Sequence, residues 1–166
     1  MTARVLVGVI SRRLLLGLLL CAAVACGAPS GVEAKHANGL TEPLQIVSAG
    51  GKVARFKVEV VDNDATRERG LMYRTSLAPD AGMLFDFKTP QQVFFWMKNT
   101  YIPLDLIFID ADGHILNIAK QATPLSLDSI PSAGAALGVL EIAGGRSDQL
   151  GITAGDVVKH RIFKAP

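Results

Sequence analysis

The sequence FFWMKNTYIPLDLIFID, from Phe94 to Asp110, contains the single Trp of the chain and three of its seven Phe residues. Two apolar runs in it flank a polar island, Lys98 to Thr100, and Pro103 precedes the second run. Short apolar runs rich in aromatic and β-branched residues indicate strands, and a Pro favours an extended conformation in the residue before it. The pattern predicts two strands joined by a turn, forming a central hairpin.

The segments on either side of this stretch also have strand patterns. Apolar residues at positions 54, 56, 58 and 60 alternate with charged ones, a period typical of a strand with one buried face. Downstream, Ala111-Asp112-Gly113 resembles a tight turn, which would make residues 104–109 and 115–119 adjacent antiparallel strands. Residues 106–109 are apolar on both sides, so we expect a central position for that strand.

The remaining elements are expected to be short. In chain order we expect a helix at residues 65–73, a strand at 83–85, a turn at 89–92, a strand at 139–142, one helical turn at 147–150 and a last strand at 157–163. Asp64 can cap the helix, and Gly70 indicates either close approach of another backbone or an early helix end. The sequence predicts a mostly β fold, a compact antiparallel β-sandwich or half-open barrel with one or two short helices.

The first quarter of the sequence differs from the rest. Arg4, Arg12 and Arg13 precede an apolar run at residues 14–24, shorter than the about 20 residues that span a bilayer. With small residues at 23–25, this is typical of an export signal, and a retained membrane anchor is the alternative. Three parts are expected along the chain: an export signal, a flexible tether and a single β domain, at residues 1–25, 26–43 and 44–166.

Three export routes fit this leader. Residues 23–25 suit a general signal peptidase. Followed by Cys26 they also resemble a lipobox, in which Cys26 would be acylated and tether the protein to a membrane, although Ala23 replaces the usual Leu. Residues 11–15 resemble a twin-arginine signal. We therefore expect an exported protein, either periplasmic or a membrane-anchored lipoprotein.

Charge and cysteine content exclude several classes of function. Three of the 17 Lys and Arg residues lie in the leader, which leaves 14 against 15 Asp and Glu and no basic stripe for nucleic acid. Cys21 and Cys26 lie in or next to the leader, so the predicted domain has no thiol for a disulfide, a metal site or a nucleophile. A phosphate-binding Gly loop is missing, and no cofactor is predicted.

Several short motifs occur in the order found in a known family. They are Gly70-Leu71-Met72 with Arg74, Gly82 to Phe85, Phe95 to Thr100, Ile102 to Asp105, Leu140-Glu141 and Gly155-Asp156. On these motifs the chain resembles the bacterial and archaeal family of domain of unknown function 192, over about residues 58–163. Arg67 and Arg74 match the family's Arg positions around Gly-Leu-Met. The resemblance implies a compact, jelly-roll-like β domain that is often exported, and no established activity.

Polar residues within apolar segments are the candidates for a site. A bare carboxylate is costly there, so we expect Asp105 to pair with Lys98, Arg67 or Arg74, and treat Glu141 in the same way. The candidate recognition face comprises Arg67, Arg74, Lys98, Asn99, Asp105 and Glu141. Its cations favour an anionic or sugar-like ligand, and the loop over residues 121–138 is expected either to roof it or to be a surface crossover. Packing and turn roles for these residues are the alternative.

Three functions fit the sequence. The first is an exported binding or interaction module of the cell envelope, with an unknown small molecule or envelope partner. The second is an envelope hydrolase or lyase that uses carboxylates, because a Cys nucleophile and a Gly-x-Ser-x-Gly elbow are both missing. The third is a Cu(I)-handling protein that uses Met72, Met83 and Met97, although Met is also a common core residue. His114 and His160 lack a metal-ligand spacing.

Overall fold

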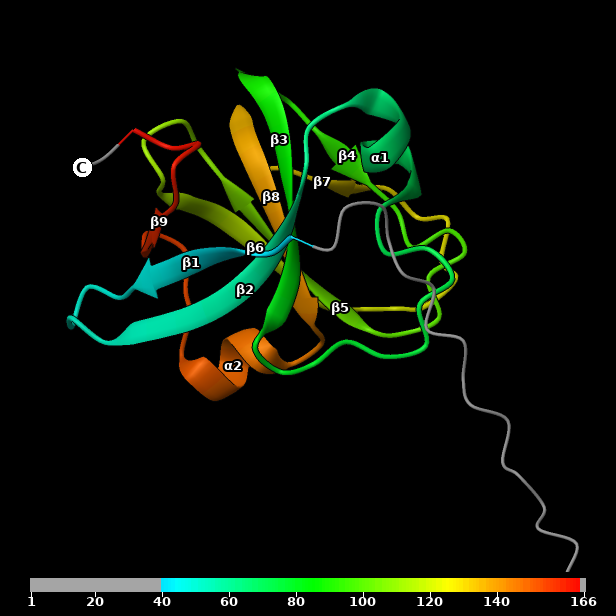
Figure 1. Ribbon diagram of the computed structural model, residues 1–166, viewed down its shortest axis with the longest axis horizontal. Coiled ribbons are helices and arrows are strands. Elements are labelled where there is room, and N and C mark those ends of the chain that lie inside the picture. The colour runs from blue at the N-terminus through cyan, green and yellow to red at the C-terminus, as the bar shows by residue number, and fades with distance from the viewer. Residues whose placement is uncertain (1–39, 165–166) are drawn as a thin grey trace, which may run out of the picture. The chain divides into compact units, whose positions relative to one another are not determined.

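The chain forms a curled seven-stranded β-sheet, and the computed structural model describes residues 40–164 (Figure 1). The strand order is β6-β5-β8-β3-β2-β1-β9, and β4 pairs with β7 in a separate two-stranded sheet. The elements are β1 Glu42–Val47, β2 Val53–Val61, α1 Asp64–Arg69, β3 Ala81–Gln91, β4 Phe94–Phe95, β5 Leu104–Ile109, β6 Ile115–Ala122, β7 Ile130–Pro131, β8 Ala136–Ala143, α2 Arg146–Leu150 and β9 Val157–Lys159. Only β2 and β3 pair in parallel among the described strands. The predicted mostly β fold with two short helices is confirmed.

The two edges of the large sheet meet at one end. His114, just before β6, forms an isolated antiparallel bridge with Val157 at the start of β9. Beside it, the Val158 N–H donates to the Gly113 carbonyl at 2.7 Å. Because β6 and β9 are the edge strands, these contacts close the sheet into a half-open barrel, one of the two architectures that the sequence left open.

The central strands β3, β8 and β5 are buried on both faces. One core cluster includes Leu44, Val158 and Ile142, so it draws on strands from all round the barrel and fills its interior. A second cluster includes Phe108 and Val139 and lies on the outer face. Every residue of β5 is buried, which explains the apolar run at residues 106–109 and confirms the central position of the strand.

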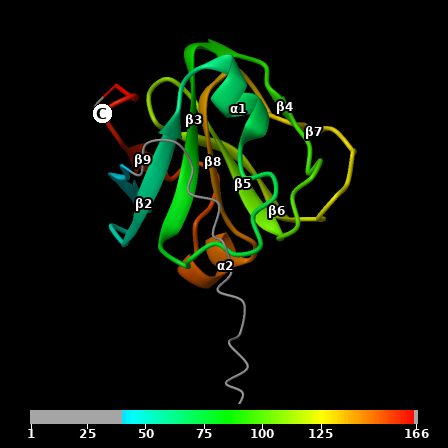
Figure 2. The same ribbon diagram turned by 45° about the vertical axis from the view of Figure 1, so that its right-hand side comes forward.

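A layer formed by α1, β4 and β7 covers the outer face of β3, β8 and β5. Figure 1 shows this layer on one side of β3, with β1, β2 and β9 on the other, and Figure 2 shows α1 in front of the sheet. Leu71, Val93 and Met97 anchor the layer because all three belong to the outer core cluster.

The two strands on either side of the polar island do not form the predicted hairpin. β4 pairs with β7, whereas β5 pairs with β6 and β8. Phe94 and Trp96 are 66% and 49% exposed, so the first apolar run belongs to the covering layer and only the second is central sheet. Both runs have strand composition, and composition alone does not distinguish a covering layer from a core strand.

Two strand boundaries also differ from the prediction. β3 continues to Gln91, so the predicted turn at residues 89–92 is mostly strand. β9 ends at Lys159 rather than at Phe163. The Phe163 N–H donates to the His160 carbonyl, so the chain turns there instead of extending.

The first helix is shorter than predicted. It begins at Asp64, and its cap is the Asn63 side chain, which accepts a hydrogen bond from the Thr66 N–H at 3.1 Å. It ends at Arg69, and its C-cap is Gly70, whose φ of 46° is unfavourable for residues with a Cβ. The early helix end is therefore confirmed, whereas the close neighbour is a side chain and not another backbone, because a Cβ at Gly70 would lie 3.1 Å from the Phe85 ring.

The predicted export signal and the lipidation candidate Cys26 lie outside the described residues. Of the predicted tether, Glu42 and Pro43 belong to β1 and therefore to the β domain. Within residues 40–164, neither helix has the length and hydrophobicity needed to span a bilayer.

Candidate ligand-binding pocket

A pocket opens on the outer face of the sheet, between that face and the covering layer of α1 and residues 94–100, here called the β4 segment. Its volume is about 300 Å³, at the small end of the range for small-molecule sites. The residues that line it are Arg67, Glu68, Arg69, Gly70, Leu71, Met72, Phe85, Phe87, Phe94, Phe95, Trp96, Lys98, Thr100 and Glu141. Most of its wall is therefore aromatic or aliphatic, with a small number of charged groups.

Strand register places the Glu141 side chain on this outer face. Glu141 of β8 is paired with Met83 of β3 and with Leu106 of β5. Residues paired across neighbouring strands project from the same face, and both neighbours belong to the outer core cluster. Neither neighbour has a hydrogen-bond donor, so the carboxyl group of Glu141 has no polar partner within the sheet.

The Glu141 carboxyl is buried and incompletely satisfied. Glu141 is 5% exposed, and its Oε2 atom has no hydrogen-bond partner among the described residues. Burial penalises the charged form and raises the pKa of Glu141 to about 8, although the positive charge of Arg74 opposes this rise. The carboxyl is therefore mainly protonated at neutral pH and can donate a hydrogen bond.

Arg74 lies outside the pocket wall and forms a partly buried ion pair. Its Nη2 atom donates to both carboxylate oxygens of Glu59, at 2.6 and 2.7 Å. Its Nε atom is buried and has no partner in the described part of the chain. The ion pair fastens the segment after α1 to β2, so Arg74 has a structural role beside its electrostatic effect on Glu141.

The charged side chains of the pocket wall are mainly cationic. Arg67 donates from Nη1 to the Asp86 carbonyl at 2.7 Å, and its guanidinium lies 5.4 Å from the centre of the Phe87 ring. The Lys98 Nζ atom lies 5.0 Å from the centre of the Trp96 ring. Both contacts are within cation–π range.

A shallow groove of about 260 Å³ adjoins the pocket and extends it. Its walls are Ala65, Glu68, Arg69, Met72, Lys98 and Asn99. Asn99 has a φ of 56°, and its Nδ2 atom donates to the Tyr73 hydroxyl at 3.0 Å. Asn99 thus shapes the turn and also faces the groove. Neither Arg69 nor Lys98 forms an ion pair within residues 40–164, so both charges are available to a ligand.

Asp105 does not belong to this site. It is paired with Ile142, which lies in the interior cluster, so its side chain projects from the opposite face to that of Glu141. Its carboxylate accepts hydrogen bonds from the backbone N–H groups of Gln121, Gly145 and Ser147, each at 2.8 Å, and from the Ser147 hydroxyl at 2.6 Å. The expected ion pair with a nearby cation is therefore wrong.

The hydrogen bonds to Asp105 also explain its ionisation. Burial alone would raise the pKa of this carboxyl, but the donors from Ser147, Gln121 and Gly145 outweigh burial and hold the pKa below its ordinary value. Asp105 therefore stays charged in the fold and secures the start of α2.

The loop over residues 121–138 does not roof the pocket. None of its residues lines the pocket, and β7 within it pairs with β4. The Met97 N–H donates to the Ser126 carbonyl at 3.0 Å, and the Leu125 N–H donates to the Thr100 carbonyl at 3.1 Å. The loop therefore supports the β4 segment, and α1 and that segment enclose the pocket.

The three methionines are not gathered in one cavity. Met83 and Met97 are each 1% exposed within the outer core cluster, and only Met72 lines the pocket. Among the described residues, no group of three or more His, Cys, Asp or Glu side chains is arranged to hold a metal ion.

Of the six predicted site residues, Arg67, Lys98 and Glu141 line the pocket and Asn99 lines the groove. Arg74 influences the site from outside its wall, and Asp105 lies on the other face of the sheet. Sequence reasoning missed Glu68 and Arg69, which immediately precede the Gly-Leu-Met motif. Gly70 indicates an early helix end, and a helix that ends there places Glu68 and Arg69 in its last turn. That signal could have predicted both residues as part of the site.

The fold and the site together define a small half-barrel protein with a pocket on the outside of its sheet. The family model for domain of unknown function 192 (DUF192), described as an "Uncharacterized ACR", matches residues 45–160. The chain belongs to this family, as its motifs indicated.

Solved structures similar to this chain include the following two. One, from Sinorhizobium meliloti, is named as a candidate transcription regulator; it is 42% identical, with a TM-score of 0.71, over 72% of this chain and 92% of the other. The second, a protein of unknown function from Novosphingobium aromaticivorans, is 40% identical, with a TM-score of 0.71, over 75% of this chain and 89% of the other. Among curated proteins, none is significantly similar in sequence.

Proposed function

We propose that this protein is an exported binding module of the cell envelope, and that its pocket takes a small anionic or sugar-like molecule. The observation that carries the proposal is the buried carboxyl of Glu141, whose Oε2 atom has no partner within residues 40–164. It lines an aromatic pocket together with two cations, Arg69 and Lys98, that form no ion pair in the same range. Ligand sites generally combine apolar walls with a few convergent polar groups in this way.

The charges at the pocket favour an anion. Arg69 and Lys98 form no ion pair in the described structure. The pocket wall contains two acids, Glu68 and Glu141, and the raised pKa of Glu141 leaves Glu68 as the negative charge that opposes the cations at neutral pH. The exposed ring of Phe94 supplies a flat apolar surface against which a sugar or another ring can stack.

The leader pattern supports the cell envelope as the location. The transcription role in the name of the Sinorhizobium relative has less support in this chain, because the charge balance without the leader leaves no basic stripe for DNA.

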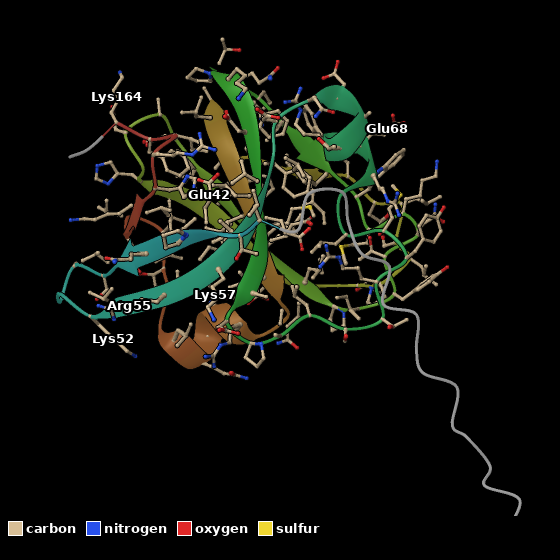
Figure 3. All side chains as sticks on the ribbon, in the orientation of Figure 1. Glu42, Lys52, Arg55, Lys57, Glu68 and Lys164 are labelled. Carbon is tan, nitrogen blue, oxygen red and sulfur yellow. The ribbon has the colours of Figure 1, made fainter. Side chains whose placement is uncertain are left out.

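Thermal unfolding with a panel of sugar acids, sugar phosphates, neutral sugars and aromatic acids tests this function. A ligand at about 100 times its Kd stabilises a protein by about 2.7 kcal/mol, which is readily measured. The gain should shrink in the Arg69→Ala/Lys98→Ala double variant. It should persist in the control Arg55→Ala/Lys159→Ala, which removes the same amount of charge from β2 and β9, outside the pocket. Figure 3 shows Arg55 on β2, away from Glu68 of α1. Equal losses in both double variants would contradict binding at this pocket.

A carboxylate-dependent hydrolase or lyase is the second candidate function. Asp105 and Glu141 face opposite sides of the sheet, so they are not an acid–base pair around one substrate. Glu68 and Glu141, however, line the same pocket, and Glu141 has the raised pKa that suits a general acid. Turnover of an envelope glycan that is lost in both Glu68→Gln and Glu141→Gln would establish this candidate, and turnover that survives both changes would remove it.

A further inference from the structure

We propose that Glu141, in its neutral form, donates a hydrogen bond to a carboxylate at the inner end of the ligand, so that the pocket selects small aromatic carboxylates. This inference rests on the proposed binding function and names the ligand class of the same pocket.

The floor of the pocket lacks a partner for this carboxyl. Glu141 lines the pocket and is 5% exposed, and no described residue bonds its Oε2 atom, while Met83 and Leu106 beside it offer no donor. A buried polar group without a hydrogen bond costs free energy, which a ligand atom at this point would recover. A neutral carboxyl that meets a carboxylate forms a short O–H···O⁻ bond, which is stronger than a bond between neutral groups.

The surrounding charges favour a carboxylate over an ammonium group at the floor. Arg74 acts on Glu141 as a nearby positive charge, and Lys98 and Arg69 lie along the entrance from the groove. An aromatic pocket with a buried acid would otherwise suit a cationic ligand. Here Arg67 and Lys98 already lie over the Phe87 and Trp96 rings, so the protein's own cations use those ring faces.

The walls favour a ring as the body of the ligand. Phe85 and Phe95 meet edge to face, with ring centres 5.0 Å apart, and both line the pocket. Aromatic rings pack preferentially in such edge-to-face or offset arrangements, so an additional ring extends the same packing. A volume of about 300 Å³ limits the ligand to one or two rings.

The binding is coupled to a proton, because only neutral Glu141 donates. Charged groups face Glu141 from α1, from the segment after it, from β2 and from the segment after β4; they are Arg67, Glu68, Arg69, Arg74, Glu59 and Lys98. The neighbouring strands β3 and β5 present only the uncharged Met83 and Leu106. Glu141 is the buried carboxyl among them, and its pKa of about 8 places its ionisation above neutral pH. A carboxylate ligand should therefore bind about tenfold more weakly at about pH 9 than at about pH 6.

The test measures the affinity of the full-length protein for 2-naphthoate, 2-naphthamide and 2-naphthylmethylamine by calorimetry at both pH values. The proposal expects 2-naphthoate to bind most tightly and to weaken about tenfold at the higher pH. Glu141→Gln keeps a neutral donor and removes the ionisation, so it should keep 2-naphthoate binding and lose the pH dependence. Glu141→Leu should lose at least about tenfold in affinity, the effect of one hydrogen bond to a charged group. Asp112→Asn, an exposed change in the 111–113 turn, should match the wild type.

Three other outcomes overturn the proposal. Tightest binding of 2-naphthylmethylamine, strengthened at high pH and lost in Glu141→Gln, would show that an ionised Glu141 binds a cation, and the pocket would remain a binding site. Binding of 2-naphthoate with equal affinity at both pH values would rule out Glu141 as the hydrogen-bond donor to the carboxylate, while the pocket would still bind an anion. If none of the three probes binds to wild type or to Glu141→Gln, aromatic carboxylates are ruled out as the ligand class. A sugar that still stabilises the protein in thermal unfolding would, in that case, support the proposed binding function.

Discussion

Glu141 and Asp105 lie on the adjacent strands β8 and β5, and their carboxyl groups project from opposite faces of the sheet. Asp105 accepts four hydrogen bonds from Gln121, Gly145 and Ser147. The Oε2 atom of Glu141 accepts none among the described residues. Burial penalises the charged form of both groups, but the hydrogen bonds to Asp105 outweigh it and lower its pKa, whereas the pKa of Glu141 is raised. Asp105 therefore stabilises the fold, whereas the Glu141 carboxyl stays without a partner for its Oε2 atom among the described residues.

The raised pKa of Glu141 predicts that stability falls as pH rises. The pKa moves from 4.5 in the unfolded chain to about 8 in the fold, so the unfolded state loses this proton first. Full stability is present below pH 4.5 and is lost progressively up to about pH 8, by about 5 kcal/mol at most. Urea unfolding of wild type and Glu141→Gln measures the difference. Parallel pH dependences in the two proteins would rule out this origin.

Replacing Asp105 should destabilise the fold strongly. Asp105→Ala leaves three backbone N–H groups and a hydroxyl without their acceptor, and we expect a loss of about 3–5 kcal/mol. Asp105→Asn should recover little, because its amide would point a donor toward donors. The exposed change Asp112→Asn should cost within about 0.5 kcal/mol in the same chemical denaturation. A similarly small cost for Asp105→Asn would disprove the role of these hydrogen bonds.

Trp96 and Met97 should respond very differently to truncation. Trp96 is 49% exposed, so Trp96→Ala should cost no more than about 1 kcal/mol of unfolding free energy. Met97 is 1% exposed, and Met97→Ala should cost about 2–5 kcal/mol because it leaves a cavity in the outer cluster. Thermal and urea unfolding of both variants compare them. A larger cost for Trp96→Ala would mean that the indole is part of the core.

Closure of the barrel can be tested at two glycines. Gly113 has a φ of 90°, and a Cβ there would lie 2.7 Å from the Val158 carbonyl oxygen. Gly51 has a φ of 78° and open space around it. The left-handed backbone alone should contribute about 1–2 kcal/mol to the cost of either change to Ala.

Only Gly113→Ala should cost more than that backbone penalty, because the added Cβ would push β9 away from the 111–113 turn. Hydrogen exchange should then show faster exchange of the Val158 N–H, which donates to Gly113. Equal unfolding free energies for the two variants would argue against a closed edge at this point.

The strands were largely predictable because period and turn chemistry are local. Alternation at residues 54–60 defined β2, and Ala111-Asp112-Gly113 defined the turn between β5 and β6. The hairpin was not predictable in the same way. Phe94 and Phe95 have strand composition, but their partner β7 lies about 35 residues further along the chain.

The site was predictable as a set of unusual residues and not as an arrangement. A carboxylate in an apolar strand is a visible anomaly, and it correctly singled out both Asp105 and Glu141 as buried. Which face each occupies depends on the register between β5 and β8, and a shift of one residue would place the two carboxyl groups on the same face. The backbone donors that satisfy Asp105 have no sequence signature, so the ion pair was the natural but wrong expectation.

The most direct test of a ligand pocket built on a neutral Glu141 is the titration of that carboxyl itself. The chemical shift of its side-chain carboxyl carbon, in protein labelled with 13C-glutamate and assigned by comparison with Glu141→Gln, reports protonation against pH. We predict a protonated group at neutral pH with a midpoint at about 8. A midpoint near the ordinary value of 4.5 would contradict the account.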